Sequence, residues 1–242
     1  MKRRTFIAAC SLPFAASAFA ASPLDCLDEK TRALAERNQT DWAQLNRYRA
    51  DNDALRANKT RVDVVFMGDS ITEGWVTKTP DLFKSGRVGR GISGQTTPQM
   101  LVRFRQDVID LKPRVVHIMA GTNDVAGNTG PMTPEMTQEN LMSMVELAHA
   151  NKIKVVLASI PPAGRFPWRP EVQTIPAIPN LNAWIKGYAN AHNIIYADYF
   201  AALADDKGAM KPGLANDGVH PTPEGYAVMN PITERAIAKA LR

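Results

Sequence analysis

The sequence predicts an α/β fold, a three-layer α/β/α sandwich built on a five-stranded parallel sheet. From Arg61 onward, four short apolar runs and one weaker strand-like run at Arg87–Ile92 alternate with amphipathic helical patterns, which is typical of a parallel sheet covered by helices on both faces. The apolar runs are continuous rather than alternating, which indicates strands buried on both faces. Ligands bind beyond the carboxyl ends of the strands in such sheets, so polar residues at those ends are the functional candidates.

The first twenty residues are expected to be a signal peptide. Basic residues at positions 2–4 precede an apolar stretch at positions 6–19, and Ala18-Phe19-Ala20 offers a small-x-small cleavage pattern. The run RRTFI at positions 3–7 also resembles a twin-arginine export signal, although a simple positive leader explains it equally well. Either leader predicts a periplasmic or secreted protein with no stable membrane insertion after cleavage.

Two alternatives for the leader remain open. The run IAAC, which ends at Cys10, superficially matches a lipoprotein cleavage box, and an uncleaved leader would act as a membrane anchor. Cleavage after residue 20 would remove three positive charges and no acidic residue, so the net charge of +5 would fall by three to +2. So small a charge gives no support for nucleic-acid binding. Cys26 would remain alone, and no intrachain disulfide could form.

Residues 21–60 are expected to form an N-terminal helical cover on the main domain, which spans residues 61–242. This stretch is polar and helix-prone from Leu27 to Asn58, and four apolar or aromatic side chains recur in it at helical spacings. These side chains are Trp42, Leu45, Tyr48 and Leu55.

The main domain is expected to contain five strands and four longer helices. Apolar runs such as VVHIMA give the strands, and periodic apolar positions give the helices. The strands are expected at Val62–Met67, Arg87–Ile92, Val115–Ala120, Val155–Ile160 and Ile194–Ala197, and the helices near Pro98–Leu111, Pro134–Ala150, Asn180–Ala191 and Pro223–Leu241.

A candidate nucleophile follows the first expected strand, in the run Gly68-Asp69-Ser70-Ile71-Thr72. A serine at a helix start just past a strand end has an exposed hydroxyl and lies among unpaired backbone N–H groups. A plain N-cap serine is common at such a position. Ser70 therefore needs chemical partners elsewhere in the sequence before it indicates a reaction.

Candidate oxyanion donors follow the second and third strands. Asn123, in the run GTND, has a side-chain amide that could stabilise a developing oxyanion. Gly94, in the run GISGQT, would let the backbone approach a substrate closely and direct an N–H group towards it. Taken singly, an Asx turn and an ordinary tight turn explain these two runs as well.

A candidate acid–base pair lies near the C-terminus, in the run DGVHP. Asp217 precedes His220 by three residues in a loop ahead of the last helix, so its carboxylate could hold and stabilise the imidazole that a serine nucleophile requires. The competing interpretations are an ordinary surface loop and a metal site. A metal is not expected, because His117 lies within a strand while His149 and His192 lie on helices.

Together these four runs resemble the SGNH, or GDSL-type, hydrolase family, and the resemblance covers most of the chain from Val62 onward. It implies a flavodoxin-like fold and a serine esterase without a cofactor, in which Ser70 is the nucleophile and Asp217 and His220 complete the triad. It further implies an oxyanion hole made by the Ser70 N–H, the Gly94 N–H and the Asn123 amide.

Within that family, the runs GRGISGQTT and GTNDVAGN look most like the bacterial branch similar to platelet-activating-factor acetylhydrolase subunits. Gln95 departs from the family pattern, because many members have an acidic residue there. The chain has no G-x-S-x-G motif, which argues against an ordinary α/β-hydrolase.

The substrate is expected to be a short-chain ester, either a small molecule or an acetylated carbohydrate. The proline-rich loop from Pro161 to Pro179 would line one wall of the site, and Trp168 could stack on a sugar ring or simply pack the loop onto the domain. The other contact candidates in this loop are Arg165, Phe166 and Arg169.

Two rival functions stay open at this point. A lysophospholipase or thioesterase would use the same triad with a deeper acyl pocket, whereas a non-catalytic carbohydrate-binding module would keep the fold alone. The second rival is disfavoured, because the chain retains Ser70, Asn123, Asp217 and His220 together.

Overall fold

The computed structural model describes residues 28–242, which form parts of two units divided between Thr40 and Asp41. The expected leader at residues 1–20 and Cys26 lie outside the described residues. The described part of the first unit is helix α1 (Glu29–Thr40), and Asp28 accepts a hydrogen bond from the Thr31 N–H at its start, over 3.0 Å. The remainder of this section concerns the second unit.

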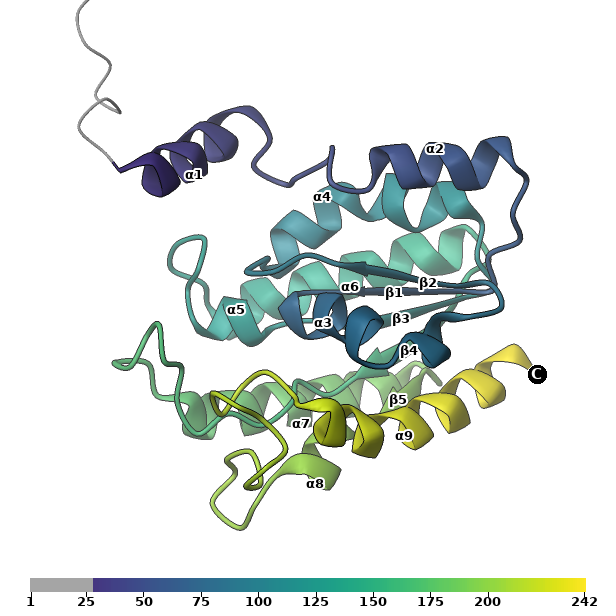
Figure 1. Cartoon of the computed structure of the whole chain (residues 1–242). Coiled ribbons are helices and arrows are strands. Elements are labelled where there is room, and N and C mark those ends of the chain that lie inside the picture. Colours follow the sequence, from purple (N-terminus) through teal and green to yellow (C-terminus); the bar gives the residue numbers. More distant parts are fainter. Residues whose placement is uncertain (1–27) are drawn as a thin grey trace, which may run out of the picture. The chain divides into compact units, whose positions relative to one another are not determined.

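The second unit is built on a five-stranded sheet whose strands are all parallel, in the order β2-β1-β3-β4-β5 (Figure 1). The chain adds β2 on one side of β1 and then β3, β4 and β5 on the other side. The switch point, where ligands bind in flavodoxin-like sheets, therefore lies between β1 and β3. All five expected strands are present within two residues of their predicted ends. They are β1 (Val64–Gly68), β2 (Arg87–Gly91), β3 (Val115–Met119), β4 (Lys154–Ala158) and β5 (Ile195–Ala197).

Alternate residues of the strands face two separate hydrophobic cores, one on each side of the sheet. Val65 and Met67 of β1 lie in one core with residues from α4, α6 and α7, while Val64 and Phe66 lie in the other with residues from α3, α8 and α9. The predicted three-layer sandwich is therefore confirmed. The helices are α2 (Arg49–Ala57), α3 (Ser70–Lys78), α4 (Thr97–Asp107), α5 (Thr122–Val125), α6 (Pro134–Ala150), α7 (Thr174–Ala191), α8 (Tyr199–Leu203) and α9 (Pro223–Leu241), with short 3₁₀ turns at Pro80–Phe83 and Ile109–Leu111.

Helix α7 begins at Thr174, six residues earlier than expected, so the end of the proline-rich loop is helical. The backbone is non-helical at Ile175, with φ −112° and ψ 120°. Pro179 lies in the first turn after this break, where a proline removes at most one intrahelical hydrogen bond. The expectation of a loop up to Pro179 was therefore wrong for these last residues.

The helical pattern expected over residues 27–58 is interrupted between α1 and α2. The Asp41 carboxylate accepts hydrogen bonds from the N–H groups of Leu45 and Asn46, over 2.7 and 3.0 Å. A side chain that binds the backbone in this way favours a turn over a continued helix. Trp42, Leu45 and Tyr48 consequently lie in a turn rather than on a helix face. The predicted boundary at residue 60 stays a prediction.

Helix length and hydropathy bear on membrane insertion. Across residues 28–242, the helices are all too short or too polar to cross a lipid bilayer.

Candidate active site

The register of the sheet brings the candidate runs to one edge. Gly68, the last residue of β1, pairs with Gly91 at the end of β2 and with Met119 at the end of β3. The runs that contain Ser70, Gly94 and Asn123 start just beyond these three ends. A Cβ on Gly91 would lie 2.2 Å from the Glu73 nitrogen, so only glycine permits β2 to end this close to the first turn of α3.

Ser70 is the first residue of α3, and Asp69 is its N-cap. The buried Asp69 carboxylate accepts a hydrogen bond from the Ile71 N–H over 2.9 Å. Burial is the main influence on this carboxyl and raises the pKa of Asp69 to about 6. Ser70 thus starts a helix whose first N–H groups have no acceptor within the helix backbone.

The structure brings Ser70, His220 and Asp217 into one hydrogen-bonded chain. The Ser70 Oγ lies 2.9 Å from the His220 Nε2, and the His220 Nδ1 lies 2.7 Å from the Asp217 Oδ2. The other carboxylate oxygen of Asp217 accepts the N–H groups of Val219 and His220, over 3.0 and 2.8 Å. Burial opposes ionisation of Asp217, but the hydrogen bonds from His220 and Val219 outweigh it and hold its pKa below the usual value.

The loop that carries Asp217 and His220 is fixed at both ends. A β-bridge joins Ala215 to Pro221, and Gly218 supplies a left-handed turn with φ +81°. Thr222 then caps α9: its hydroxyl accepts the Gly225 N–H over 3.2 Å and donates to the Gly213 carbonyl over 2.9 Å. The acid–base pair is therefore held by local contacts.

Gly94 and Asn123 lie on either side of Gln95 at the same edge. Gly94 has φ +78°, and a Cβ built on it would meet nothing within 4 Å, so the backbone there faces open space. Asn123 is buried in α5; its Nδ2 donates to the Gln95 carbonyl over 3.0 Å and lies 3.5 Å from the Asp69 Oδ2. The second contact is long for a hydrogen bond, so this N–H is held only weakly by Asp69.

Asn128 is a site residue that the sequence analysis missed. Its Nδ2 donates to the Asn123 Oδ1 over 2.7 Å, and its own Oδ1 accepts the Trp168 indole N–H over 3.0 Å. Because the Asn123 oxygen is thereby occupied, its nitrogen is turned towards Gln95 and Asp69. The signal was present in the sequence, since Asn128 ends the run GTNDVAGN.

The proline-rich loop places one of its candidates beside the triad. The Trp168 ring lies 6.0 Å from the His220 ring, stacks on Phe166 at 5.1 Å and is 39% exposed. Phe166 is fully buried, so it supports Trp168 rather than meeting a ligand. Arg169 donates to the Gly127 carbonyl over 3.4 Å, and Arg165 is exposed without a hydrogen bond or ion pair to the described catalytic candidates.

The remaining histidines have structural surroundings. His117 is buried in β3 with its Nε2 2.8 Å from the Tyr199 hydroxyl, and burial lowers its pKa to about 3. His149 lies in the last turn of α6, and His192 is the C-cap residue of α7. Within residues 28–242, no cluster of three or more His, Cys, Asp or Glu side chains could hold a metal ion.

Replacing Asn128 by aspartate is expected to lower kcat for ester hydrolysis by about fivefold, because one hydrogen bond is worth roughly 1 kcal/mol. The aspartate would still accept the Trp168 N–H but could not donate to Asn123, whose amide would lose its fixed orientation. Steady-state kinetics would measure the loss. Asn151→Asp, at the far C-cap of α6, is the matched control. Equal kcat in both variants would contradict the role of Asn128.

Comparisons with known proteins place the chain among acyl-bond hydrolases. Residues 66–228 match the family described as GDSL-like Lipase/Acylhydrolase. A candidate acylhydrolase from Bacteroides fragilis is 49% identical, with a TM-score of 0.80 over 84% of this chain and 100% of that chain. Axe2, an acetylxylan esterase from Geobacillus stearothermophilus, is 25% identical, with a TM-score of 0.59 over 73% of this chain and 94% of that one.

Two further relatives are similar in sequence. Esterase TesA of Pseudomonas aeruginosa is 27% identical over 65% of this chain and 79% of its own length. The uncharacterised lipoprotein YqeF of Bacillus subtilis is 30% identical over 62% of this chain, and the match spans 60% of the length of YqeF. The family match covers more than half of the chain and includes the runs that contain Ser70, Gly94, Asn123, Asp217 and His220. The chain therefore belongs to the GDSL-like lipase and acylhydrolase family of carboxylic ester hydrolases, as its sequence motifs predicted.

Proposed function

We propose that this chain is a serine esterase that hydrolyses short-chain O-esters through an acyl-enzyme. The observation that carries the proposal is the hydrogen-bonded chain from Ser70 through His220 to Asp217, with distances of 2.9 and 2.7 Å. A serine hydroxyl is a weak nucleophile until a neighbouring base takes its proton, and this arrangement supplies the base and the carboxylate that orients it.

In the first half of the reaction, the Ser70 Oγ attacks the ester carbonyl carbon while its proton passes to the His220 Nε2. The carbonyl π bond opens, and the negative charge on the oxygen is stabilised by the Ser70 N–H, the Gly94 N–H and the Asn123 amide. The carbonyl then re-forms as the bond to the alcohol oxygen breaks. The alcohol leaves with the proton from His220, and the acyl group stays on Ser70.

The second half repeats these steps with water. His220 takes a proton from the water, the resulting hydroxyl oxygen attacks the acyl carbon, and the same three donors hold the oxyanion. The bond to the Ser70 Oγ breaks, and the proton held by His220 returns to that oxygen. The products are a carboxylic acid, an alcohol and the free enzyme, and no cofactor takes part in these steps.

The acyl group is proposed to be acetyl, carried on a carbohydrate. Trp168 supports this choice, because its ring is partly exposed beside His220, and aromatic faces offer a flat apolar surface on which a sugar ring can stack. The similarity to Axe2, itself an acetylxylan esterase, supports it independently. Arg165 and Trp168 are the proposed substrate contacts in this loop.

A series of p-nitrophenyl esters tests the acyl-chain length. We expect kcat/KM to be highest for the acetate or the butyrate and to fall by about tenfold or more by the octanoate, because a pocket shaped for a short acyl group must exclude each added methylene. The same order of kcat/KM with 4-methylumbelliferyl esters would show that the preference comes from the acyl chain and not from the alcohol half of the probe. A maximum at the octanoate or beyond would favour the lysophospholipase or thioesterase alternative.

A fluorophosphonate probe separates catalysis from simple binding. It forms a covalent bond only with an activated serine, so mass spectrometry should find the label on Ser70. A carbohydrate-binding module that merely retains the fold would remain unlabelled. Screening acetylated sugars against the same protein would then identify the alcohol half of the substrate.

Export of the protein is proposed from the leader at residues 1–20, towards the periplasm or the outside of the cell. The similarity to YqeF supports it, because that protein is described as a lipoprotein. An acetyl-carbohydrate esterase would meet polymeric substrates in those compartments.

A further inference from the structure

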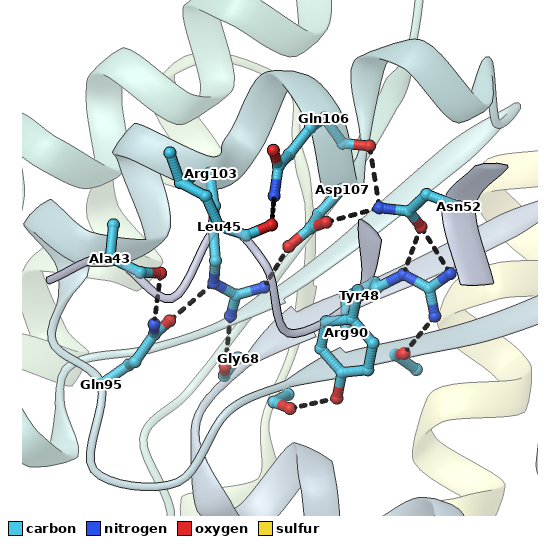
Figure 2. A network of polar contacts seen from close by, with 12 residues as sticks. Ala43, Leu45, Tyr48, Asn52, Gly68, Arg90, Gln95, Arg103, Gln106 and Asp107 are labelled. Carbon is cyan, nitrogen blue, oxygen red and sulfur yellow. Dashed lines mark hydrogen bonds and ion pairs between the residues drawn. The ribbon is translucent and has the colours of Figure 1, made fainter. Parts of the chain in front are cut away.

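A buried polar network around Arg103, which includes Gly68 and Gln95, has no part in the mechanism (Figure 2). Arg103 of α4 stands at its centre with a fully buried side chain. Its guanidinium makes three contacts: Nε donates to the Gln95 Oε1 over 2.6 Å, one terminal nitrogen to the Asp107 carboxylate over 3.0 Å, and the other to the Gly68 carbonyl over 3.0 Å. These contacts join α4, which carries both Arg103 and Asp107, to the end of β1 and to the turn after β2.

Two of these contacts end beside the proposed backbone donors. Gly68 lies two residues before Ser70, and Gln95 directly follows Gly94. The Gly68 carbonyl also accepts the Ile92 N–H over 3.2 Å, which ties the end of β1 to the end of β2. Arg103 therefore joins the end of β1, which leads into the Ser70 N–H, to the turn that carries the Gly94 N–H.

The third donor is connected through the same residue. The Gln95 carbonyl accepts the Asn123 Nδ2 over 3.0 Å, while the Gln95 side chain accepts the Arg103 Nε–H. A displacement of Gln95 would thus move the acceptor that orients Asn123. All three proposed oxyanion donors are therefore linked to one guanidinium indirectly, Gly94 and Asn123 through Gln95 and Ser70 through Gly68 and Asp69.

A guanidinium is suited to this position and an ammonium is not. Its planar, forked N–H groups can meet three acceptors in fixed directions, whereas lysine offers a single nitrogen. Burial lowers the pKa of Arg103, and the charge of Asp107 opposes that shift, so the pair keeps the cation ionised in the interior. Arg103→Lys would keep the charge and the ion pair but lose the fork.

Residues 42–52 also belong to this network. The Gln95 Nε2 donates to the Ala43 carbonyl over 2.9 Å, and the Asn52 Nδ2 donates to the Asp107 Oδ1 over 2.6 Å. A carboxylate at position 95 could accept from Arg103 but could not donate to Ala43. Gln95 therefore joins Arg103 to the turn before α2.

We propose that Arg103 is a positioning residue for the oxyanion hole, which holds the Ser70 and Gly94 N–H groups and the Asn123 amide at the spacing that the tetrahedral intermediate requires. The inference rests on the proposed serine-esterase function. It concerns the transition state rather than substrate binding, because Arg103 is buried and has no access to the ester.

The test compares Arg103→Lys with Arg90→Lys in hydrolysis of p-nitrophenyl acetate. Arg90 is a suitable control because it is 4% exposed and its guanidinium bonds to Asn52 and the Gly89 carbonyl, not to Gly68 or Gln95. Arg103→Lys is expected to lower kcat by about 10- to 100-fold with KM nearly unchanged, since small displacements of catalytic groups cost about this much. Arg90→Lys should stay within about threefold of wild type.

Two further readouts separate positioning from a loss of structure. The pH midpoint of kcat/KM should be the same in wild type and Arg103→Lys, because His220 and Asp217 are untouched, and the thermal midpoints of the two arginine variants should be similar. A wild-type kcat in Arg103→Lys would overturn the proposal. An equal loss of kcat in Arg90→Lys would overturn it too, because the effect would then belong to the buried network in general.

Position 95 gives a second test that does not need Arg103→Lys to fold. Gln95→Leu removes both side-chain hydrogen bonds and should lower kcat as Arg103→Lys does. Gln95→Glu restores the acceptor for Arg103, so its kcat should be at least about fivefold higher than that of Gln95→Leu. Equal kcat in the two variants would contradict the proposal. If the wild type itself shows no serine-dependent hydrolysis, the proposed function fails first, and that outcome is separate from a failure of these variants.

Discussion

Replacing Ser70 by alanine is expected to lower kcat for a short-chain ester by about a millionfold, because the serine, histidine and aspartate of a triad act as one unit. The variant keeps the three oxyanion donors and His220, so its residual rate should reflect binding and electrostatic stabilisation alone. The Oγ that is removed lies 2.9 Å from the His220 Nε2. Assays at high enzyme concentration with p-nitrophenyl acetate would measure the residual rate.

The control for this experiment is Ser143→Ala on α6, a helix that starts more than ten residues beyond Asn123. It should hydrolyse the ester at the wild-type rate and accept the fluorophosphonate label on Ser70. Retention of more than about 1% of the wild-type kcat by Ser70→Ala would exclude Ser70 as the nucleophile, since no other catalytic device of a triad enzyme leaves so much activity.

Replacing Asn123 by alanine is expected to lower kcat by about 10²–10³, the size found when one oxyanion donor is lost. KM should change little, because the amide meets the oxygen mainly after that oxygen has acquired negative charge. The substitution also leaves the Gln95 carbonyl and the Asn128 amide without their partner. Thermal unfolding must therefore accompany the steady-state kinetics.

Asn140→Ala on α6 is the matched control for Asn123→Ala, since its amide makes two hydrogen bonds, to the Thr97 hydroxyl and the Met136 carbonyl. Its kcat should stay close to that of the wild type even if its thermal midpoint falls. A wild-type kcat in a folded Asn123→Ala protein would remove the amide from the oxyanion hole and leave only the two backbone donors.

The fold and the catalytic candidates could be predicted because both depend on short local patterns. The runs DVVFM and VVHIMA are continuous enough to require burial on both faces, and buried parallel strands end together at one edge. Register then places Gly68 beside Gly91 and Met119, which brings the runs after them into one site. The Asp217–His220 contact spans three residues, so its spacing was visible directly in the sequence.

The supporting residues could not be predicted, because their roles depend on partners far away in the chain. Arg103 and Asp107 are four residues apart on a helix, a spacing that usually indicates an exposed ion pair, yet both are fully buried. In the interior, the guanidinium of Arg103 also donates hydrogen bonds to the Gly68 carbonyl and the Gln95 side chain, and neither partner is evident from the local sequence. Asn128 is a different case, because its contact to Asn123 spans only five residues and only its contact to Trp168, 40 residues further along, is distant.

The local anchoring of Asp217 and His220 has a consequence for how the enzyme rests between turnovers. Their loop is closed by the bridge from Ala215 to Pro221, so both side chains belong to one short anchored segment. The contact to Ser70 differs, because it joins positions 150 residues apart. A displacement of this loop would therefore lengthen the Ser70 contact before it disturbs the contact between His220 and Asp217.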